Sequence, residues 1–193
     1  IGMGLDKRIG SRFLRAGPAY GGSCFPKDTR AIVNTADKYK INLSLIKSVI
    51  KSNDNRSKVL LKRVSKILNN KYKNKTISFL GVTFKANTDD MRDSSSLKMI
   101  PFLSKKVFLI KYFDPTGKKR EFDKLKNVIF CKSIKETCLK SDLIIIHTEW
   151  NDFKSINFKS LIKKKKFIVY DMRNIYSPKK MKESKIKYFG IGR

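Results

Sequence analysis

The segment around Cys24 contains the residues best suited to covalent chemistry. Cys24 follows a Gly-Gly-Ser run and precedes Pro26, and Lys27 comes three residues later. A helix N-terminus and a nearby cation both favour the nucleophilic thiolate form of a cysteine. Asp28 is close enough in sequence to orient a water molecule or a lysine. The alternative is a buried structural cysteine, the commoner role of a free thiol, but a glycine-rich loop is poor core material.

A second group of polar residues follows the apolar run TISFLGV at 76–82. The next loop contains Lys85, Arg92 and a cluster of candidate helix caps at 93–96. Free N–H groups at a helix N-terminus bind phosphate, and the two cations add positive charge. The dinucleotide fingerprint GxGxxG is absent and this loop has only Gly81, so we predict a nucleotide-sugar diphosphate rather than a whole NAD. The alternative is that both cations are ordinary surface charges.

Metal and disulfide chemistry are not predicted. The sequence has one histidine, His147, and three cysteines without CxxC spacing. This composition supports neither a His-rich metal site, nor a zinc knuckle, nor a disulfide framework. Cys131 lies in a predicted strand and Cys138 in a predicted helix with apolar neighbours, as is typical of buried structural thiols.

The elements that must position these residues fall into two classes. Over residues 1–70, a glycine-rich loop is followed by apolar residues with a helical period. We expect one helix to begin at Asp28–Thr29, with Asp28 as its cap, and a longer one over 43–68 with a possible break at 53–55. This part is predicted to be a helical segment.

From residue 75 to 193, short apolar runs alternate with stretches of helical length such as 94–103 and 133–140. The runs are TISFLGV, KVFLIKYFD, NVIFC, DLIIIHT, FIVYD and KYFGIG. Strands that alternate with helices form a mainly parallel sheet. We therefore predict an α/β protein, with the helical segment followed by a Rossmann-like parallel-sheet domain. Ligands of such sheets bind beyond the carboxyl ends of the strands, where Glu149-Trp150 and Met172-Arg173-Asn174 also lie.

The chain is strongly basic, with 45 Lys and Arg against 16 Asp and Glu and a formal net charge of +29. Such a charge attracts anions and raises nucleic-acid binding as an alternative function. Most of these cations are lysines spread along the whole chain, whereas proteins that recognise the edges of nucleic-acid bases favour arginine. We interpret them as solvated faces and expect no nucleic-acid partner. No apolar run is long enough to span a membrane, so we expect a cytoplasmic protein without a membrane partner.

The segment GPAYGGSCFPKD at 17–28 resembles the catalytic-cysteine loop of the UDP-glucose 6-dehydrogenase family. DKRIG upstream, and FLGVTFKANTDDMRDSSS, HTEW and DMRN downstream, agree with the family in order and spacing over essentially the whole chain. GDP-mannose enzymes usually have Leu where Phe25 stands, and UDP-N-acetylhexosamine enzymes typically have His where Ser23 stands. The resemblance therefore favours UDP-glucose as substrate, with a GDP-mannose 6-dehydrogenase relative as the alternative.

The resemblance implies an NAD-dependent, four-electron oxidation of UDP-glucose to UDP-glucuronate through a cysteine thiohemiacetal and thioester. Cys24 would be the nucleophile and Asp28 the carboxylate that positions water or a lysine. The residues implied for the sugar nucleotide are Arg8, Phe13, Leu14, Arg15, Ala16, Gly17, Gly21, Phe84 and Lys85. Those implied for the cofactor side are Lys27, Arg92 and Arg173. Arg8 resembles a residue that the family contributes to the neighbouring subunit's substrate, which implies a homodimer.

Two parts of the family pattern have no counterpart in these residues. They are the N-terminal domain with GxGxxG, and a long dimer-forming helix with a catalytic lysine and asparagine. The match begins just after that helix. We therefore expect this chain by itself to make no NADH but to retain weak affinity for UDP or UDP-glucose. A non-catalytic sugar-nucleotide-binding module is the alternative from a different functional class.

Overall fold

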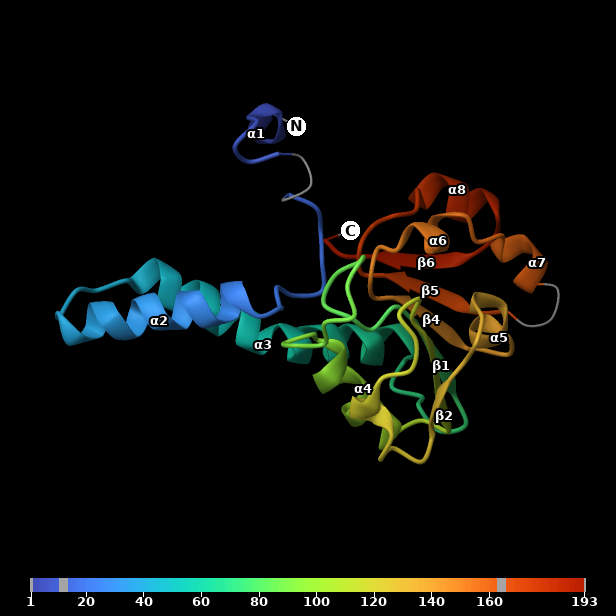
Figure 1. The fold of residues 1–193 in the computed structure, drawn as a ribbon. Helices are drawn as coiled ribbons and strands as arrows, with labels where there is room; N and C mark the ends of the chain where they lie inside the picture. The colour runs from blue at the N-terminus through green and yellow to red at the C-terminus, as the bar shows by residue number, and fades with distance from the viewer. Residues whose placement is uncertain (1, 11–13, 163–165, 193) are drawn as a thin grey trace.

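A computed structural model describes residues 2–10, 14–162 and 166–192 of the chain. Figure 1 shows a sheet with helices on both sides, from which a pair of long helices projects. A short helix, α1 (Gly2–Leu5), stands apart from both near the N-terminus. The arrangement therefore has a sheet-based part and a helical part, as the sequence predicts.

Six parallel strands form one sheet in the order β3-β2-β1-β4-β5-β6. This is the order of a doubly wound sheet. Strands β1 to β3 are added toward one edge of the sheet, and β4 to β6 are added toward the other edge, starting beside β1. Each strand lies within one of the predicted apolar runs, so the Rossmann-like prediction is confirmed. The strands are β1 (Thr76–Leu80), β2 (Leu109–Phe113), β3 (Val128–Phe130), β4 (Leu143–Ile146), β5 (Ile168–Asp171) and β6 (Lys187–Gly190).

Helices cover both faces of the sheet, so its central strands are apolar on both sides. In β4, Leu143 and Ile145 pack into one core cluster, while Ile144 and Ile146 pack into the other. The first cluster includes side chains of α3 (Ser44–Ile67) and α4 (Ser96–Ser104). The second includes side chains of α5 (Ile134–Cys138), α6 (Asn151–Lys154), α7 (Phe158–Ile162) and α8 (Pro178–Glu183). A 3₁₀ turn, η1 (Arg120–Phe122), precedes β3.

The projecting pair consists of α2 (Cys24–Lys38) and α3 (Ser44–Ile67). At 24 residues, α3 is about 36 Å long. Its C-terminal half packs on the sheet through Leu60, Val64 and Ile67. Its N-terminal half leaves the sheet together with α2 (Figure 1). One continuous helix therefore joins the two parts of the chain.

Two details of the helical prediction were wrong. Helix α2 begins at Cys24 rather than at 28–29, because Pro26 fits in the first turn, where a helix needs no backbone N–H. Asp28 consequently lies inside the helix and does not cap it. The possible break at 53–55 is absent, since α3 runs through these residues. Cys24 is thus the first residue of the helix rather than a residue ahead of it.

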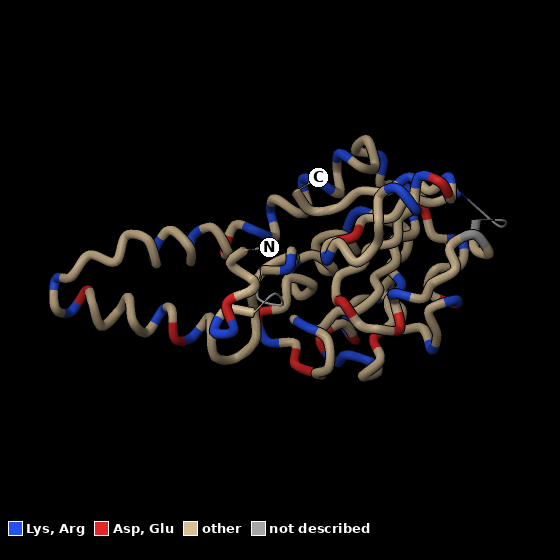
Figure 2. Tube along the Cα trace, turned by 90° about the horizontal axis from the view of Figure 1, so that it is seen from above, with Lys and Arg blue, Asp and Glu red and all other residues tan. Residues whose placement is uncertain are grey.

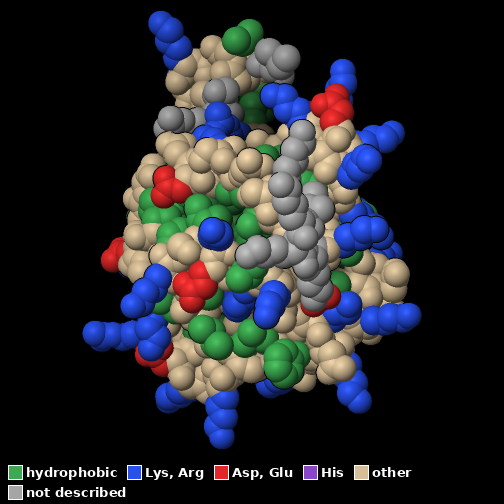
Figure 3. All heavy atoms as spheres, turned by 90° about the vertical axis from the view of Figure 1, so that its right-hand side faces the viewer, with side chains coloured by type: hydrophobic (Ala, Val, Ile, Leu, Met, Phe, Trp, Pro, Cys, Tyr) green, Lys and Arg blue, Asp and Glu red, His purple; other side chains and the backbone are tan. Residues whose placement is uncertain are grey.

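Charge does not single out one part of the molecule. Figure 2 shows Lys and Arg along the helical pair and around the sheet. Figure 3 shows basic side chains around the rim of one face, with hydrophobic side chains between them. Anions are therefore attracted from many sides, and the position of a site must come from its local geometry.

Two kinds of feature are absent from the part of the chain that the structure describes. None of its helices combines the length and apolar character needed to cross a membrane. Its His, Cys, Asp and Glu side chains form no group of three or more that could hold a metal ion.

Candidate active site

The carboxyl ends of β1 and β4 meet at the point where the strand order reverses. The loop after β1 begins at Gly81, and its start is fixed by Asp114 at the end of β2. The Oδ2 atom of Asp114 accepts hydrogen bonds from the backbone N–H groups of Val82 at 2.9 Å and Thr83 at 3.4 Å. Asp114 is buried, so this contact is part of the framework. Asp114 was not among the residues predicted from the sequence, although a polar residue directly after a strand at this edge was a usable signal.

The loop that precedes α2, residues 17–23, crosses over this edge of the sheet and is called the cysteine loop below. The N–H of Gly22 donates to the carbonyl of Arg92 at 2.8 Å. A Cβ at Gly21 would lie 2.7 Å from the carbonyl oxygen of Asp93, and one at Gly22 would lie 2.8 Å from the Phe84 ring. Gly22 also has φ of +85°. Only glycine permits such an approach, so the Gly-Gly pair determines how closely this loop packs on the loop after β1.

The same loop is fastened to α3 on its other side. Tyr20 and Asn53 exchange two hydrogen bonds of 3.1 Å each, between the Tyr20 backbone and the Asn53 amide. The Nε atom of Arg56 donates to the carbonyl of Pro18 at 3.0 Å. The rings of Tyr20 and Phe25 pack edge to face with centroids 4.8 Å apart. The cysteine loop is therefore held between the helical part and the sheet.

Cys24 is exposed at the N-terminus of α2, with two cations near its thiol. The pKa of Lys27 is raised chiefly by its hydrogen bond to Asp28, with a smaller contribution from Cys24. The pKa of Arg92 is raised chiefly by its hydrogen bond to Asp90, again with a smaller contribution from Cys24. One cation thus comes from α2 and the other from the loop after β1, and both interact electrostatically with the thiol.

Both cations are paired with carboxylates, of which Asp28 is exposed and Asp90 is half-buried. The Nζ of Lys27 lies 2.7 Å from Asp28 Oδ1. Arg92 makes two contacts with Asp90, of 3.0 Å through Nε and 2.9 Å through Nη2. Exposed ion pairs contribute little to stability, so an anionic ligand could replace Asp28 at small cost. Asp90 is held more firmly, because it also accepts a hydrogen bond of 2.8 Å from the backbone N–H of Arg92. Asp28 itself points to Lys27 in this arrangement.

Lys85 lies at the place where the two loops meet. It is exposed, and its Nζ is 5.2 Å from the centroid of the Phe84 ring. That ring packs against Gly22 of the cysteine loop. The structure therefore brings these two predicted substrate residues close to the segment that carries Cys24.

Arg173, which follows β5, lies beneath the cysteine loop. Its Nη2 donates to the carbonyl of Phe84 at 2.7 Å, and its Nε donates to the carbonyl of His147 at 3.0 Å. Nε also forms an ion pair of 2.9 Å with Glu149 Oε2. A Cβ at Gly17 would lie 3.0 Å from Nη1. Burial lowers the pKa of Arg173, and Glu149 opposes this effect. The guanidinium thus connects three strand-end loops with the cysteine loop.

The remaining predicted substrate residues precede Gly17. Arg8 is exposed and forms its contacts with Asp6, of 3.1 Å through Nε and 2.7 Å through Nη2. It lies near α1, which stands apart from the sheet (Figure 1). Leu14 and Arg15 are exposed and Ala16 is half-buried, while Phe13 lies outside the described residues. The structure therefore gathers the residues from Gly17 onward and leaves Arg8 away from them.

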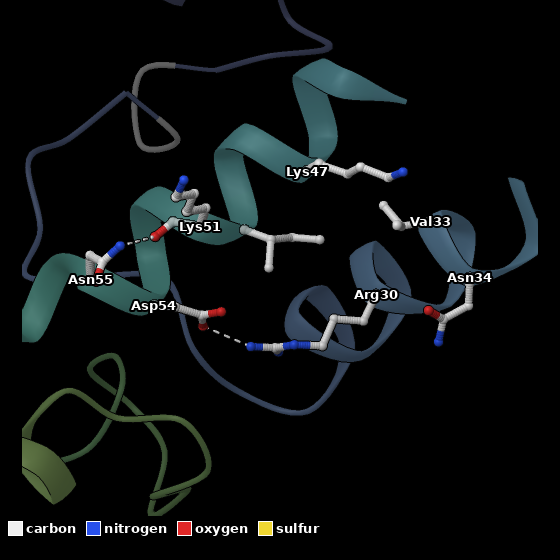
Figure 4. A pocket seen from close by; sticks show the side chains of 8 residues that line it. Arg30, Val33, Asn34, Lys47, Lys51, Asp54 and Asn55 are labelled. Carbon is white, nitrogen blue, oxygen red and sulfur yellow. Dashed lines mark hydrogen bonds and ion pairs between the residues drawn. The ribbon is translucent and has the colours of Figure 1, made fainter. Parts of the chain in front are cut away.

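A groove outside this edge lies in the helical part. It measures about 410 Å³ between α2 and α3, and Arg30, Val33, Lys47, Ile50 and Asp54 are among its lining residues (Figure 4). The ion pair of Arg30 with Asp54, of 2.8 Å, crosses one end of it. A second hollow of about 20 Å³ near the N-terminus of α4 is too small for a nucleotide. Neither includes Cys24 or Lys85, so we place the candidate site by its chemistry, at the open edge of the sheet.

Two family profiles match this chain. The profile described as "UDP-glucose/GDP-mannose dehydrogenase family, UDP binding domain" matches residues 78–178. The profile for the central domain of the same family matches residues 1–55. The first profile runs from within β1 to beyond β5 and includes the loop with Lys85, but it does not reach β6. The second covers the loop with Cys24.

Curated relatives and solved structures agree with these profiles. The UDP-glucose 6-dehydrogenase of Rickettsia felis is 40% identical over 99% of this chain and 43% of its own length. That of Rhizobium meliloti is 37% identical over 100% of this chain and 44% of its own length. The structure of a UDP-glucose dehydrogenase from Pyrobaculum islandicum has a TM-score of 0.79 and 27% identity, and covers 98% of this chain and 41% of that one. This chain thus spans less than half the length of the relatives it matches.

Proposed function

Because the chain belongs to the UDP-glucose/GDP-mannose dehydrogenase family, we propose that it carries the catalytic cysteine and the UDP-sugar site of an NAD-dependent UDP-glucose 6-dehydrogenase. The observation that supports this most directly is the close packing of Gly21 and Gly22 on the loop after β1. This packing brings Cys24, whose thiol is exposed, close to the loop that carries Lys85. Both lie at the edge where doubly wound sheets bind nucleotides.

The proposed reaction converts the C6 alcohol of UDP-glucose to a carboxylate in two oxidations. The first removes a hydride from C6 and a proton from its hydroxyl, which leaves an aldehyde. The Cys24 thiolate adds to the aldehyde carbon as a thiohemiacetal, and removal of a second hydride gives a thioester. Water then attacks the acyl carbon, the C–S bond breaks, and the acid and the thiolate are released. NAD, when bound, accepts one hydride in each oxidation.

A thiolate suits this sequence because it is both a good nucleophile and a good leaving group from an acyl carbon. Lys27, from α2, and Arg92, from the loop after β1, each interact electrostatically with Cys24. In the proposal Asp28 positions the attacking water or a catalytic lysine, after it leaves its contact with Lys27. The carboxylate is already exposed, so this change of partner costs little.

For the sugar nucleotide, the proposal assigns Lys85 to the diphosphate and Phe84 to the packing of the bound ligand. The loop over 14–21 covers the ligand from the side of the helical part. Arg8, which is exposed, is assigned to the substrate of a neighbouring subunit in a homodimer. Ser23 and Phe25 favour UDP-glucose over a GDP-mannose or UDP-N-acetylhexosamine substrate.

The residues present fit only part of an NAD molecule. Lys27 and Arg92 are exposed cations, and the carboxylate partner of Lys27 is exposed as well, so the proposal assigns both cations to the pyrophosphate. Arg173, also predicted on the cofactor side, has Nε and Nη2 engaged by protein groups. The sequence contains no GxGxxG turn, so the proposal leaves the main nucleotide contacts of NAD to residues outside this chain.

The test is Cys24→Ala in the complete enzyme that contains this chain. We expect UDP-glucuronate formation to be abolished and UDP-glucose affinity, measured by calorimetry, to stay within about twofold, because the thiolate acts after the substrate has bound. Cys131→Ala is the matched control, since Cys131 is buried and directly follows β3, an outer strand two positions from β1 in the sheet. Turnover near that of the control in the Cys24→Ala enzyme would refute the nucleophile assignment and favour a non-catalytic binding module.

A further inference from the structure

Glu149 has a place in the site that its position in the sequence does not reveal. It follows β4 closely, and its Oε2 atom is buried, 2.9 Å from Nε of Arg173. Among the described residues, this oxygen accepts no aligned hydrogen bond, so the ion pair is its main interaction. The side chains of Glu149 and Arg173 are 28% and 12% exposed. The pair is therefore shielded enough from water for the charge of one to control the position of the other.

Arg173 depends on that charge. A guanidinium taken out of water without a counter-charge is costly. Burial is the largest influence on the pKa of Arg173, and it is opposed first by Glu149 and less by Asp171. The two carbonyls that Arg173 binds, those of Phe84 and His147, are neutral. Without the Glu149 carboxylate, the guanidinium would gain by turning toward solvent.

The contacts of Arg173 are those that define the site. Phe84, whose carbonyl it binds, carries the ring that packs against Gly22. Its Nη1 lies against Gly17, at the start of the cysteine loop. Loss of the guanidinium from this place would therefore release the cysteine loop at Gly17 and loosen the surface on which Gly22 packs.

We propose that Glu149 is a positioning residue: it holds Arg173 under the loop of Cys24 and so fixes how this loop packs on the sheet edge. The importance of that packing for catalysis rests on the proposed function, but the packing itself does not. It can be measured at the amide of Gly22, whose hydrogen bond to the Arg92 carbonyl joins the two parts. The amide of Tyr20 serves as an internal control, because its partner Asn53 belongs to the helical part.

The experiment is amide hydrogen exchange, resolved by NMR, on the chain and on its Glu149→Gln variant, without substrate or cofactor. We expect the Gly22 amide to exchange about tenfold faster in the variant and the Tyr20 amide to keep its rate, as for the loss of one hydrogen bond to a charged group. Glu149→Asp, which keeps the charge, should restore most of the protection. Glu183→Gln on α8, with an exposed carboxylate, should change neither amide.

A double-mutant cycle decides whether Glu149 acts through Arg173. In an Arg173→Gln background, Glu149→Gln should cause no further acceleration at Gly22, because the two changes remove the same contact. An unchanged Gly22 rate in the single variant, or equal acceleration of Gly22 and Tyr20, would overturn the proposal. So would a full tenfold effect that persists in the Arg173→Gln background. Since no turnover is measured, a failed oxidation by the complete enzyme would leave these outcomes untouched.

Discussion

The ring of Phe84 lies directly against Gly22, so that a Cβ at position 22 would come within 2.8 Å of its Cζ atom. Gly22 belongs to the helical part of the chain and Phe84 to the loop after β1, which places the thiol two residues further on at a fixed distance from the sheet. The contact requires two properties of glycine at once, the absence of a side chain and a φ of +85°. This combination makes Gly22 the most informative position at which to test the packing.

We predict that Gly22→Ala lowers the free energy of unfolding by more than the strain of its backbone conformation accounts for. An L-residue in the left-handed region costs about 1–2 kcal/mol, and displacement of the Phe84 ring adds to this. Gly117→Ala is the matched control, because Gly117 has φ of +90° and open space around its Cβ position. Urea denaturation should show a loss larger than that of the control by about 1 kcal/mol or more. Equal losses would mean that the ring moves aside freely.

Lys85 provides a test of the ligand. We predict that Lys85→Ala weakens UDP-glucose binding by about tenfold or more in the complete enzyme, since a hydrogen bond to a charged group contributes about 1.5–3 kcal/mol. Lys135→Ala, which removes an exposed lysine from α5, controls for the general attraction of a basic protein for anions. Calorimetric titrations at two salt concentrations would separate the two effects. Equal affinities in both variants would mean that Lys85 is an ordinary surface charge with no specific contact to the ligand.

His147 makes the free energy of unfolding of the chain depend on pH. It is fully buried, with its Nε2 atom 2.8 Å from the Ser95 hydroxyl. Burial, and to a lesser extent Arg173, lowers its pKa to about 3 from the ordinary value of 6.5. The folded pKa is below the unfolded one, so the unfolded chain binds more protons between these values. The contribution of neutral His147 to the free energy of unfolding is therefore fully present above pH 6.5 and declines as the pH falls.

We accordingly predict that the free energy of unfolding falls by about 1.5 kcal/mol between pH 6.5 and 5, which follows from about 1.4 kcal/mol per unit of pKa difference. His147 is the sole histidine in the sequence, and most carboxylates remain ionised in this interval. Urea denaturation across the interval should therefore show a slope that His147→Gln removes. A slope of the same size in the variant would assign the effect to other groups.

The sequence predicted the strands and the edge of the sheet that carries the site, for a physical reason. Each strand is buried on both faces, so it leaves a short, continuous apolar run such as Leu143–Ile146 between polar segments. Parallel strands place their carboxyl ends at one edge, so Lys85, Glu149 and Arg173 could be expected near each other from topology alone. The start of α2 was predicted four residues late because Pro26 looked like a residue outside the helix, whereas the first turn accepts it.

The contacts inside the site were not predictable from the sequence. Gly22 and Phe84 are more than sixty residues apart, and no local pattern indicates that one needs the space beside the other. The same holds for Asp114, which fixes the backbone of the loop after β1, and for the partner of Glu149. Such contacts depend on how the chain returns to the same edge, which the strand order determines and the periodicity of single segments does not.

The last prediction concerns the chain of 193 residues by itself. Hydride transfer requires the nicotinamide to lie within roughly 3–3.5 Å of C6 of the sugar, and these residues contain no GxGxxG turn to hold the pyrophosphate. The sheet edge nevertheless keeps Lys85 exposed beside the packed cysteine loop, in a chain with a net charge of +29. We therefore expect the purified chain to make no NADH from NAD and UDP-glucose, followed by absorbance in the NADH band, and to bind UDP weakly in an NMR titration. Chemical-shift changes should centre on Phe84 and Gly22, because UDP would enter where the two loops meet. Sustained NADH formation would show that the chain holds a complete active site. No shift changes at millimolar UDP would show that the sugar-nucleotide site forms only with residues beyond this chain.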